Sequence, residues 1–216
     1  MRNKVNIGKK MKILIATHNK EKLHRYSRLL LGVSNLELLS LDDLAITEKA
    51  EENFSTNIEN AKHKAEFYGE LSGIITLSID EAVETNFLPD NEQPGVYVRR
   101  FSGDKKELSD NAVVAVWQEI FKKYPQEDKK FIWSFAVVFY NPGNDSLEMV
   151  DIKQISYVAH KISNKKSNGY PLSRVMSPEK NGISYADLSQ EDAWKYDIVV
   201  FTKFINKFTE WIEKQN

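Results

Sequence analysis

The sequence predicts an α/β fold in which a long, mixed central sheet is flanked by helices. Two observations support this prediction: short apolar runs rich in β-branched residues alternate with segments whose apolar residues recur every three or four positions. Of the 216 residues, 41% are hydrophobic and 28% are charged, which provides for both a core and a solvated surface. This length favours one domain over several, and we expect residues 11–216 to form it.

The composition also disfavours several classes of protein. Lysine and arginine number 30 against 31 acidic residues, and a nucleic-acid-binding protein usually carries a clear cationic excess. The absence of cysteine removes disulfides, thiolate metal sites and cysteine nucleophiles. The longest apolar run, residues 131–140, is far shorter than the roughly 20 residues that cross a bilayer. We therefore expect no nucleic-acid partner, no membrane span and a cytoplasmic location.

The first ten residues are polar and basic and lack the apolar stretch and cleavage site of a secretory signal. Met11 stands directly before the first strand-like segment. Residues 1–10 are therefore expected to be either a disordered extension or the product of an upstream start.

The first predicted unit is a strand, a polar turn and a helix. Residues 12–16 (K-I-L-I-A) are apolar and lead into Thr17, His18 and Asn19, after which Leu23, Tyr26 and Leu30 follow helical spacing. A strand that passes through a tight turn into a helix points backbone N–H groups at a bound anion. This turn is a candidate phosphate site.

The second predicted unit contains a helix and a strand that ends in acid. Thr56 and Glu59 fit a capping box, and the helix that they begin has an apolar face flanked by Lys62 and Lys64. That face comprises Ile58, Ala61, Ala65 and Tyr68. Residues 74–79 are rich in β-branched residues and predict a strand that Asp80 and Glu81 end, at the edge where open α/β sheets bind ligands.

The rest of the chain continues this mixture of elements. We expect a loop at 87–104, a helix around 113–120 that ends near Pro125, a strand at 131–140, a turn at 141–145, a partner strand at 147–159, and a final amphipathic helix that carries Phe201, Ile205, Phe208 and Ile212.

Several common catalytic motifs are absent from the sequence. There is no G-x-S-x-G, P-loop or G-x-G-x-x-G pattern, and the four histidines are too scattered to suggest a zinc site. Glu52 and Asp80 could share a hard cation such as Mg²⁺, while Lys22, Lys64 and Arg100 neutralise phosphates. For any one of these lysines the alternative is a solvated helix face.

Three segments, in this order, resemble the inosine triphosphate pyrophosphatase family. Residues 16–22 (A-T-H-N-K-E-K) resemble its A-T-x-N-x-x-K phosphate loop. Residues 50–65 (A-E-E-N-F-S-T-N-I-E-N-A-K-H-K-A) are similar to its E-E-x-x-x-[ST]-[FY]-x-E-N-A-x-x-K-A stretch. Residues 93–103 (Q-P-G-V-Y-V-R-R-F-S-G) resemble its A-P-G-V-Y-S-A-R-Y-[AS]-G segment.

The resemblance implies an elongated, two-lobed α/β protein with a nucleotide in the cleft between its lobes, and a Mg²⁺-dependent hydrolysis of nonstandard purine triphosphates to monophosphate and pyrophosphate. It also implies a homodimer, for which the aromatic-rich segment 117–133 is a candidate surface; the alternative for that segment is core. The residue roles that it implies are catalysis by Asp80, Lys22 and Lys64, substrate binding by Thr17, Asn19, Arg100, Gly169 and Tyr170, and metal binding by Glu52 and Asp80.

The chain also departs from the family pattern. Residues 79–83 (I-D-E-A-V) stand where the family has D-D-S-G-L. Only the second of the family's two acids is therefore present, as Asp80, and the role of Glu81 is open. Residues 168–172 (N-G-Y-P-L) replace F-G-Y-D-P, and residues 197–199 (D-I-V) replace S-H-R, with Lys195 as a substitute cation. Two alternatives therefore stay open: a nucleotide-binding protein without turnover, and a hydrolase refitted to another nucleotide.

Overall fold

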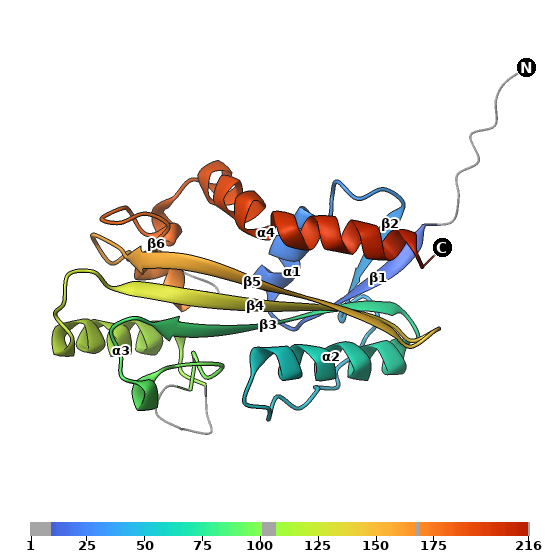
Figure 1. Cartoon of the computed structure of the whole chain (residues 1–216), viewed down its shortest axis with the longest axis horizontal. Coiled ribbons are helices and arrows are strands. Elements are labelled where there is room, and N and C mark those ends of the chain that lie inside the picture. Colours follow the sequence, from blue (N-terminus) through green and yellow to red (C-terminus); the bar gives the residue numbers. More distant parts are fainter. Residues whose placement is uncertain (1–9, 101–106, 167–168, 216) are drawn as a thin grey trace, which may run out of the picture.

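The protein is elongated and is built on one long, strongly twisted sheet (Figure 1). The computed structural model describes residues 10–100, 107–166 and 169–215. The predicted N-terminal extension lies outside the described residues except for Lys10, as do residues 101–103 of the third matched segment and Asn168. No helix in the described part of the chain is long and apolar enough to span a membrane.

Six strands form the sheet, in the order β2-β1-β3-β4-β5-β6. β1 pairs in parallel with both β2 and β3, and the pairs β3–β4, β4–β5 and β5–β6 are antiparallel, which confirms the predicted mixed sheet. The strands are β1 (Met11–Ala16), β2 (Leu36–Ser40), β3 (Ile75–Thr85), β4 (Lys130–Asn141), β5 (Ser146–Val158) and β6 (Met176–Ser177).

The helices cover both faces of this sheet (Figure 1). They are α1 (Lys20–Leu29), α2 (Asn57–Ser72), α3 (Asp110–Lys123) and α4 (Gln190–Glu213), with short 3₁₀ turns η1 (Asp90–Glu92), η2 (Pro171–Arg174) and η3 (Tyr185–Asp187). Thr56 is the N-cap of α2, as predicted: its Oγ1 accepts from the Glu59 N–H at 3.1 Å, and its hydroxyl donates to the Glu59 carboxylate at 2.7 Å.

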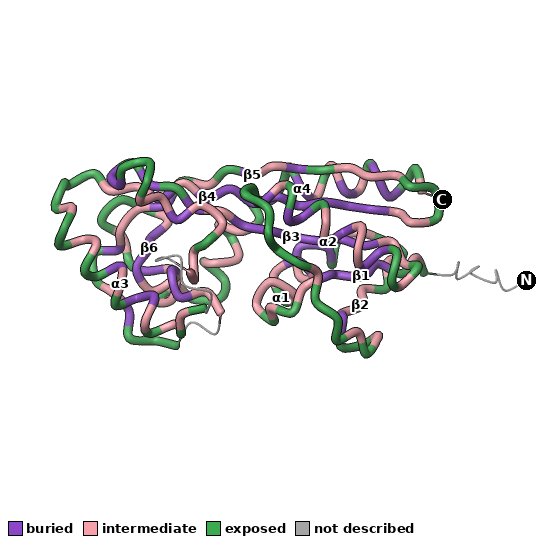
Figure 2. Tube along the Cα trace, turned by 90° about the horizontal axis from the view of Figure 1, so that it is seen from below, coloured by how far each residue is buried: buried purple, intermediate pink, exposed green. Residues whose placement is uncertain are grey.

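Alternation along β4 explains why each face takes a different helix. Phe135 and Phe139 pack in one core cluster with the aromatic side of α4, whereas Ala136 and Val138 pack in another with Ala61 and Ala65 of α2. Figure 2 shows that buried residues follow the central strands and the sheet-facing sides of these helices. Because the residues between α2 and the sheet are small, α2 approaches the sheet closely.

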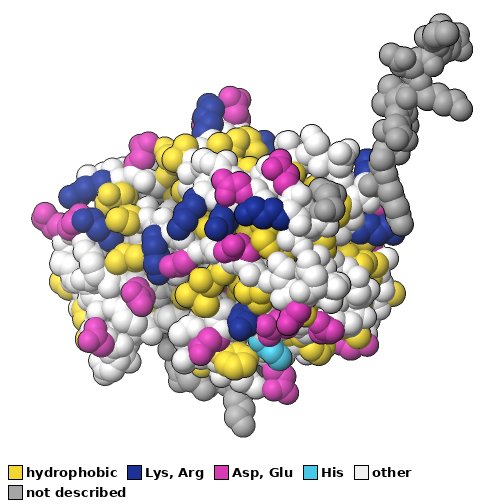
Figure 3. All heavy atoms as spheres, turned by 45° about the vertical axis from the view of Figure 1, so that its right-hand side comes forward, with side chains coloured by type: hydrophobic (Ala, Val, Ile, Leu, Met, Phe, Trp, Pro, Cys, Tyr) yellow, Lys and Arg dark blue, Asp and Glu magenta, His cyan; other side chains and the backbone are white. Residues whose placement is uncertain are grey.

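The aromatic-rich segment 117–133 contributes Trp117, Phe131 and Trp133 to the core, which was the alternative expected for it. Trp117 and Phe131 are 0% exposed and Trp133 is 6% exposed. The rings of Trp117 and Phe131 lie 4.9 Å apart between centroids, where α3 packs on the end of the sheet. Figure 3 shows that acidic and basic side chains are both present and intermixed on one face of the molecule, in agreement with the near-zero net charge.

The prediction for β3 was incomplete, and the strand β2 was missed. β3 does not end at Asp80 and Glu81 but continues to Thr85, because its residues pair with β4 as far as Thr85. Its other neighbour, β1, pairs only as far as Ala16 with Ser78. The two acids therefore lie in the middle of a strand that has just lost one neighbour, and this gives them access to a ligand. The edge strand β2, which is short and only partly buried, was not predicted.

Candidate active site

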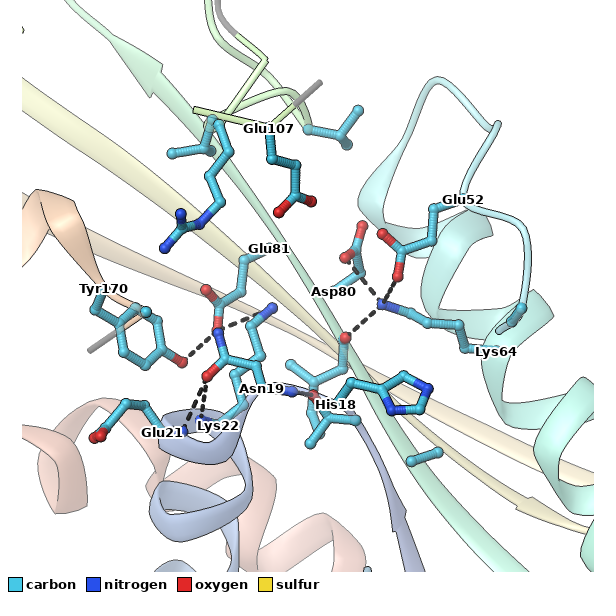
Figure 4. A pocket seen from close by; sticks show the side chains of 18 of the residues that line it. His18, Asn19, Glu21, Lys22, Glu52, Lys64, Asp80, Glu81, Glu107 and Tyr170 are labelled. Atoms are coloured by element: carbon cyan, nitrogen blue, oxygen red, sulfur yellow. Dashed lines mark hydrogen bonds and ion pairs between the residues drawn. The ribbon is translucent and has the colours of Figure 1, made fainter. Parts of the chain in front are cut away.

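A cavity of about 910 Å³ opens where β1 ends beside β3 (Figure 4). It is lined by the β1–α1 turn, the segment before α2, the middle of β3 and the turns at 96–100 and 169–170. All the site residues expected from the sequence line it: Thr17, Asn19, Lys22, Glu52, Lys64, Asp80, Arg100, Gly169 and Tyr170. The structure thus brings together residues from segments far apart in the chain.

The β1–α1 turn is held in place by its own side chains. Thr17 Oγ1 accepts from the backbone N–H of Asn19 at 3.1 Å, and Asn19 Oδ1 accepts from the N–H groups of Glu21 at 2.9 Å and Lys22 at 3.2 Å. Asn19 is therefore the N-cap of α1, which directs the positive end of that helix toward the cavity. Gly169 (φ 109°) lies so close that a Cβ there would come within 3.3 Å of Asn19 Oδ1.

Lys64 joins the two candidate metal-binding acids. Its Nζ lies 3.0 Å from Glu52 Oε1 and 3.1 Å from Asp80 Oδ1, and it also donates to the carbonyl of Ile79 at 2.9 Å. Figure 4 shows both carboxylates turned toward this ammonium group. Lys64 was expected to flank the apolar face of its helix, but it lies on the buried face and is only 8% exposed. Its ion pairs compensate for that burial.

These three groups differ in how the site shifts their pKa values. Burial raises the pKa of the Asp80 carboxyl, and the ammonium groups of Lys64 and Lys22 offset only part of the rise. Burial acts to lower the pKa of Lys64, but Asp80 and Glu52 outweigh it and hold that pKa above its ordinary value. Burial likewise opposes the charge of Glu52, yet Lys64 outweighs it and lowers the Glu52 pKa. The site thus disfavours the charged form of Asp80 and favours the charged form of Glu52.

Glu81 lies on the other face of β3, as expected for the neighbour of Asp80 in a strand. Its Oε1 lies 3.6 Å from Lys22 Nζ and accepts a hydrogen bond from the Tyr170 hydroxyl at 3.0 Å. Glu81 is 8% exposed, so Lys22 compensates a buried charge. The sequence left the role of Glu81 open, and the structure places it opposite one of the expected phosphate lysines.

Asp110, the first residue of α3, ties two walls of the cavity together. Its Oδ1 accepts from Arg99 Nη2 at 2.6 Å and its Oδ2 accepts from the Gly169 N–H at 3.1 Å. The turn that carries Arg100 is thereby linked to the turn that carries Tyr170. Nothing in the sequence motifs singled out Asp110, because its partners lie outside its own segment.

A second, smaller cavity of about 250 Å³ adjoins the first and shares Glu21, Trp133 and Tyr170 with it. Arg25 and Asp197 line it and form an ion pair. Arg25 was missed, although its position one helical turn after Lys22 is a signal that could have found it. Lys195, the expected substitute cation, lies elsewhere on α4 and pairs with Glu191 and Asp192.

Oxygen ligands for a cation are available at Glu52 and Asp80. Among the described residues no group of three or more His, Cys, Asp or Glu side chains is arranged to hold a metal ion. The two carboxylates approach the same ammonium group, so their oxygens lie within reach of one common centre. This donor set suits a hard cation shared with a ligand, because Mg²⁺ is commonly bound by one or two carboxylates plus substrate phosphates.

Residues 13–198 match the model of the Ham1 family. A dITP/XTP pyrophosphatase from Thermoanaerobacter sp. is 30% identical over 182 residues, covering 84% of this chain and 87% of the relative. One from Thermoanaerobacter pseudethanolicus is 31% identical over 183 residues, with the same coverage.

Solved structures agree with these sequence matches. A HAM1 protein from Coxiella burnetii has a TM-score of 0.72 at 18% identity, covering 94% of this chain and 99% of that one, which shows a common fold. A nucleoside-triphosphatase, dITP/XTP pyrophosphatase, from Mycobacterium abscessus has a TM-score of 0.63 at 25% identity, covering 89% and 95%.

Proposed function

This chain belongs to the Ham1 family, and we propose that it hydrolyses a nonstandard purine nucleoside triphosphate, such as ITP, XTP or dITP, to the monophosphate and pyrophosphate. The observation that carries the proposal is the convergence of Glu52 and Asp80 on Lys64, beside Lys22 and Arg100 in one large cavity. Relatives named for this reaction support it.

The triphosphate would lie in the larger cavity. Lys22, Lys64 and Arg100 line that cavity with positive charge, and charged donors bind phosphate oxygens strongly. The N-terminal end of α1 adds a partial positive charge at the same place. As charge shifts onto the leaving pyrophosphate, these fixed groups stabilise it without having to reorganise.

Glu52 and Asp80 would hold Mg²⁺ together with the substrate phosphates, as their shared approach to Lys64 allows. When bound, the ion supplies Lewis-acid polarisation of the phosphoryl oxygens. Lys64 neutralises the same two carboxylates when no substrate is present, which keeps them from repelling the incoming triphosphate.

Asp80 is the proposed general base. Its raised pKa makes the carboxylate a better proton acceptor than an ordinary aspartate. A water oxygen bonds to the α-phosphorus, the bond from that phosphorus to the bridging oxygen breaks, and pyrophosphate leaves with the bonding electrons. The proton lost by the water passes to Asp80 and then to solvent.

A pyrophosphate-release assay tests this function. Purified protein with Mg²⁺ should release pyrophosphate from ITP, XTP or dITP faster than from ATP or CTP, and omission of the metal should abolish release. If the folded protein releases none from any of these or from dUTP, the proposal is wrong.

A nucleotide-binding protein without turnover is the second candidate. The observation that favours it is that Ile79 occupies the position of an acid in the family pattern, leaving fewer oxygen ligands beside Asp80. It predicts that ITP raises the melting temperature while no pyrophosphate forms, because a ligand bound only to the native state stabilises that state.

We also propose that residues 11–216 act as one domain and that the protein is a cytoplasmic homodimer. The single continuous sheet supports the first statement. Light scattering on the purified chain tests the dimer, and fractionation of cells tests the location.

A further inference from the structure

The segment that carries Glu52 has no regular secondary structure. Residues 46–53 belong to neither a helix nor a strand, and the side chain of Glu52 is 42% exposed, against 11% for that of Asp80. The backbone of Asp80 is fixed because β3 pairs with β4 at this residue. The position of Glu52 must instead depend on the contacts that hold its segment.

Three side chains on one face of α2 hold this segment. Asn60, Lys64 and Tyr68 follow one another at intervals of four residues, so they lie in one row along the helix. All three side chains belong to buried residues. In Figure 4 the loop that carries Glu52 lies beside α2.

Each of the three side chains contacts a different part of the segment. Asn60 Oδ1 accepts from the Phe54 N–H at 3.2 Å, and Asn60 Nδ2 donates to the Phe54 carbonyl at 3.3 Å. Lys64 contacts the carboxylate of Glu52 itself. Tyr68 contacts the part that precedes Glu52. The backbone of the segment is therefore fixed on both sides of Glu52.

The hydroxyl group of Tyr68 bonds to the backbone of the segment at two places. It donates to the Glu48 carbonyl at 3.0 Å and accepts from the Ala50 N–H at 3.3 Å. The ring packs in a core cluster with Leu14 and Ala16 of β1, which holds the hydroxyl in a fixed place. A phenylalanine ring could fill the same space, but it could not bond to the segment.

His18, from the turn after β1, supports the same contact. Its Nε2 lies 3.3 Å from the Glu48 carbonyl oxygen and 3.2 Å from the Tyr68 hydroxyl oxygen. Because the hydrogen of that hydroxyl is directed to the carbonyl, both neighbours of Nε2 are acceptors, and Nε2 is the donor. The β1–α1 turn is thereby joined to the segment that carries Glu52.

We propose that Tyr68, supported by His18, is a positioning residue for the carboxylate of Glu52 as a ligand of Mg²⁺. By fixing the backbone two and four residues before Glu52, the Tyr68 hydroxyl keeps that carboxylate close to Asp80. A ligand that is already in place binds an ion more tightly, because no further ordering of its segment has to accompany binding. This inference rests on the proposed function, which takes Glu52 as a metal ligand.

Tyr68→Phe tests the proposal, because it removes the hydroxyl and keeps the ring. Mg²⁺ is titrated by calorimetry into the protein bound to an ITP analogue in which a methylene group replaces the oxygen between the α- and β-phosphorus atoms, so that this bond is not hydrolysed. We expect the Kd for Mg²⁺ to rise about tenfold, as is common when a group that orients a metal ligand is removed. With ITP as substrate, the Mg²⁺ concentration for half-maximal rate should rise by a similar factor, while kcat at saturating Mg²⁺ changes little.

Tyr124→Phe is the matched control. The Tyr124 hydroxyl also donates a hydrogen bond, to Glu92 at 2.9 Å, but neither of these residues lines the larger cavity. The Kd for Mg²⁺ should stay unchanged in this variant. If Tyr68→Phe changes the Kd no more than the control does, the proposal is wrong.

A double-mutant cycle with Glu52→Gln shows whether Tyr68 acts through Glu52. If it does, Tyr68→Phe should leave the Kd for Mg²⁺ unchanged in the Glu52→Gln background, because the carboxylate that Tyr68 positions is no longer there. The same rise in both backgrounds would contradict the proposal, since the effect would then not pass through Glu52.

The outcomes separate this inference from the proposed function. If Glu52→Gln itself leaves the Kd for Mg²⁺ unchanged, the metal site of the proposed function is wrong. If Glu52→Gln weakens Mg²⁺ binding and Tyr68→Phe does not, only the positioning role is wrong.

Thermal unfolding shows whether Tyr68→Phe is folded. If it is not, a pair of variants at His18 takes its place. His18→Ala removes the donor to the Glu48 carbonyl and should raise the Kd for Mg²⁺, whereas His18→Gln keeps an N–H donor and should restore the value of the unmodified protein. Equal Kd values in the two His18 variants would contradict the proposal.

Discussion

At the scale of single residues, the most informative feature is an ammonium group between two carboxylates. Lys64 lies within 3.1 Å of both Glu52 and Asp80. Acids this close to one another would each raise the pKa of the other if no cation were present. Lys64 therefore allows the acids to stay near each other in the free protein, ready for a cation and phosphates.

Replacing the proposed general base, Asp80, should lower the rate of hydrolysis without disrupting the fold. Asp80→Asn should lower kcat at least 100-fold, because general-base catalysis commonly contributes about that much. The fold should remain near intact, since the amide keeps the shape of the side chain and removes a carboxylate whose pKa burial has raised. Pyrophosphate release and thermal unfolding measure the two effects. An equally active variant would remove the catalytic assignment.

Replacing Lys64, whose ammonium group contacts both acids, should destabilise the protein. Lys64→Met leaves the buried Asp80 carboxylate without its partner, and breaking a buried pair in this way costs about 3 kcal/mol of unfolding free energy. Lys62→Met, on the exposed side of the same helix, should change stability far less. Urea unfolding of both variants gives the comparison, and equal losses would show that the ion pairs have no special effect.

The pH dependence of hydrolysis should report Asp80. Because only its ionised form accepts a proton, kcat/KM should fall as the pH drops through the pKa of Asp80. Lys22 lowers that pKa, so Lys22→Met should move the acid limb to higher pH. Lys12→Met, which does not line the cavity, is the control, and a limb that does not move would contradict the assignment.

The raised pKa of Asp80 also makes the stability of the folded state depend on pH. Folding raises the pKa of Asp80, so the unfolded chain loses this proton first as the pH rises. As the pH rises from about 3.8 through the raised pKa of the folded protein, Asp80 therefore makes the folded state less stable, and above that pKa the effect no longer changes with pH. Asp80→Asn should remove that component, which unfolding measured at several pH values would detect.

At the scale of elements, the site depends on where β1 stops and α1 begins. β1 ends opposite Ser78 while β3 continues, which opens the sheet beside Asp80 and Glu81. Asn19 then caps α1 and fixes the direction in which Lys22 leaves the helix. The end of one strand and the start of one helix thus decide the position of several site residues.

Removing this cap should affect both stability and substrate binding. Asn19→Ala should cost about 1 kcal/mol of unfolding free energy and raise KM, because the cap positions the phosphate turn. Ser189→Ala removes the cap of α4, where Ser189 accepts from the Asp192 N–H, and should cost a similar amount without changing KM. If KM stays the same in both variants, the Asn19 cap has only a structural role.

At the scale of the whole molecule, the cavity is assembled from distant parts of the chain. Asp110 connects the turn that carries Arg100 with the turn at Gly169, and Gly169 packs against Asn19 near the start of the chain. These contacts position the turns that carry Arg100 and Tyr170, the residues expected to bind the substrate.

Asp110→Asn tests this connection. The substitution keeps the size of the side chain but removes the charge that holds Arg99 and the Gly169 N–H. Weakening hydrogen bonds to a charged group should raise KM about tenfold while kcat changes little. Steady-state kinetics with ITP measures both constants. A fall in kcat with unchanged KM would show that the connection acts on the chemical step instead.

Much of the fold follows from local patterns. The periodicity of residues 12–16, 113–120 and 131–140 predicted elements that are present, and the Thr56–Glu59 capping pattern marks the true start of α2. The end of β3 was misplaced because two adjacent acids resemble the end of a strand. Their true context depends on β4, which pairs with β3 well beyond the last residue of β1.

The sequence alone determined which elements form and which segments contain candidate site residues, because helical and strand periodicity and cap chemistry act over a few neighbouring residues. The tertiary structure decided which of those residues meet. Lys64 lies between Glu52 and Asp80 only because α2 packs closely on β3 and β4. Arg25 meets Asp197 only because α1 and α4 share one face of the sheet. Such pairs depend on the packing of distant segments, and a local pattern carries no record of that packing.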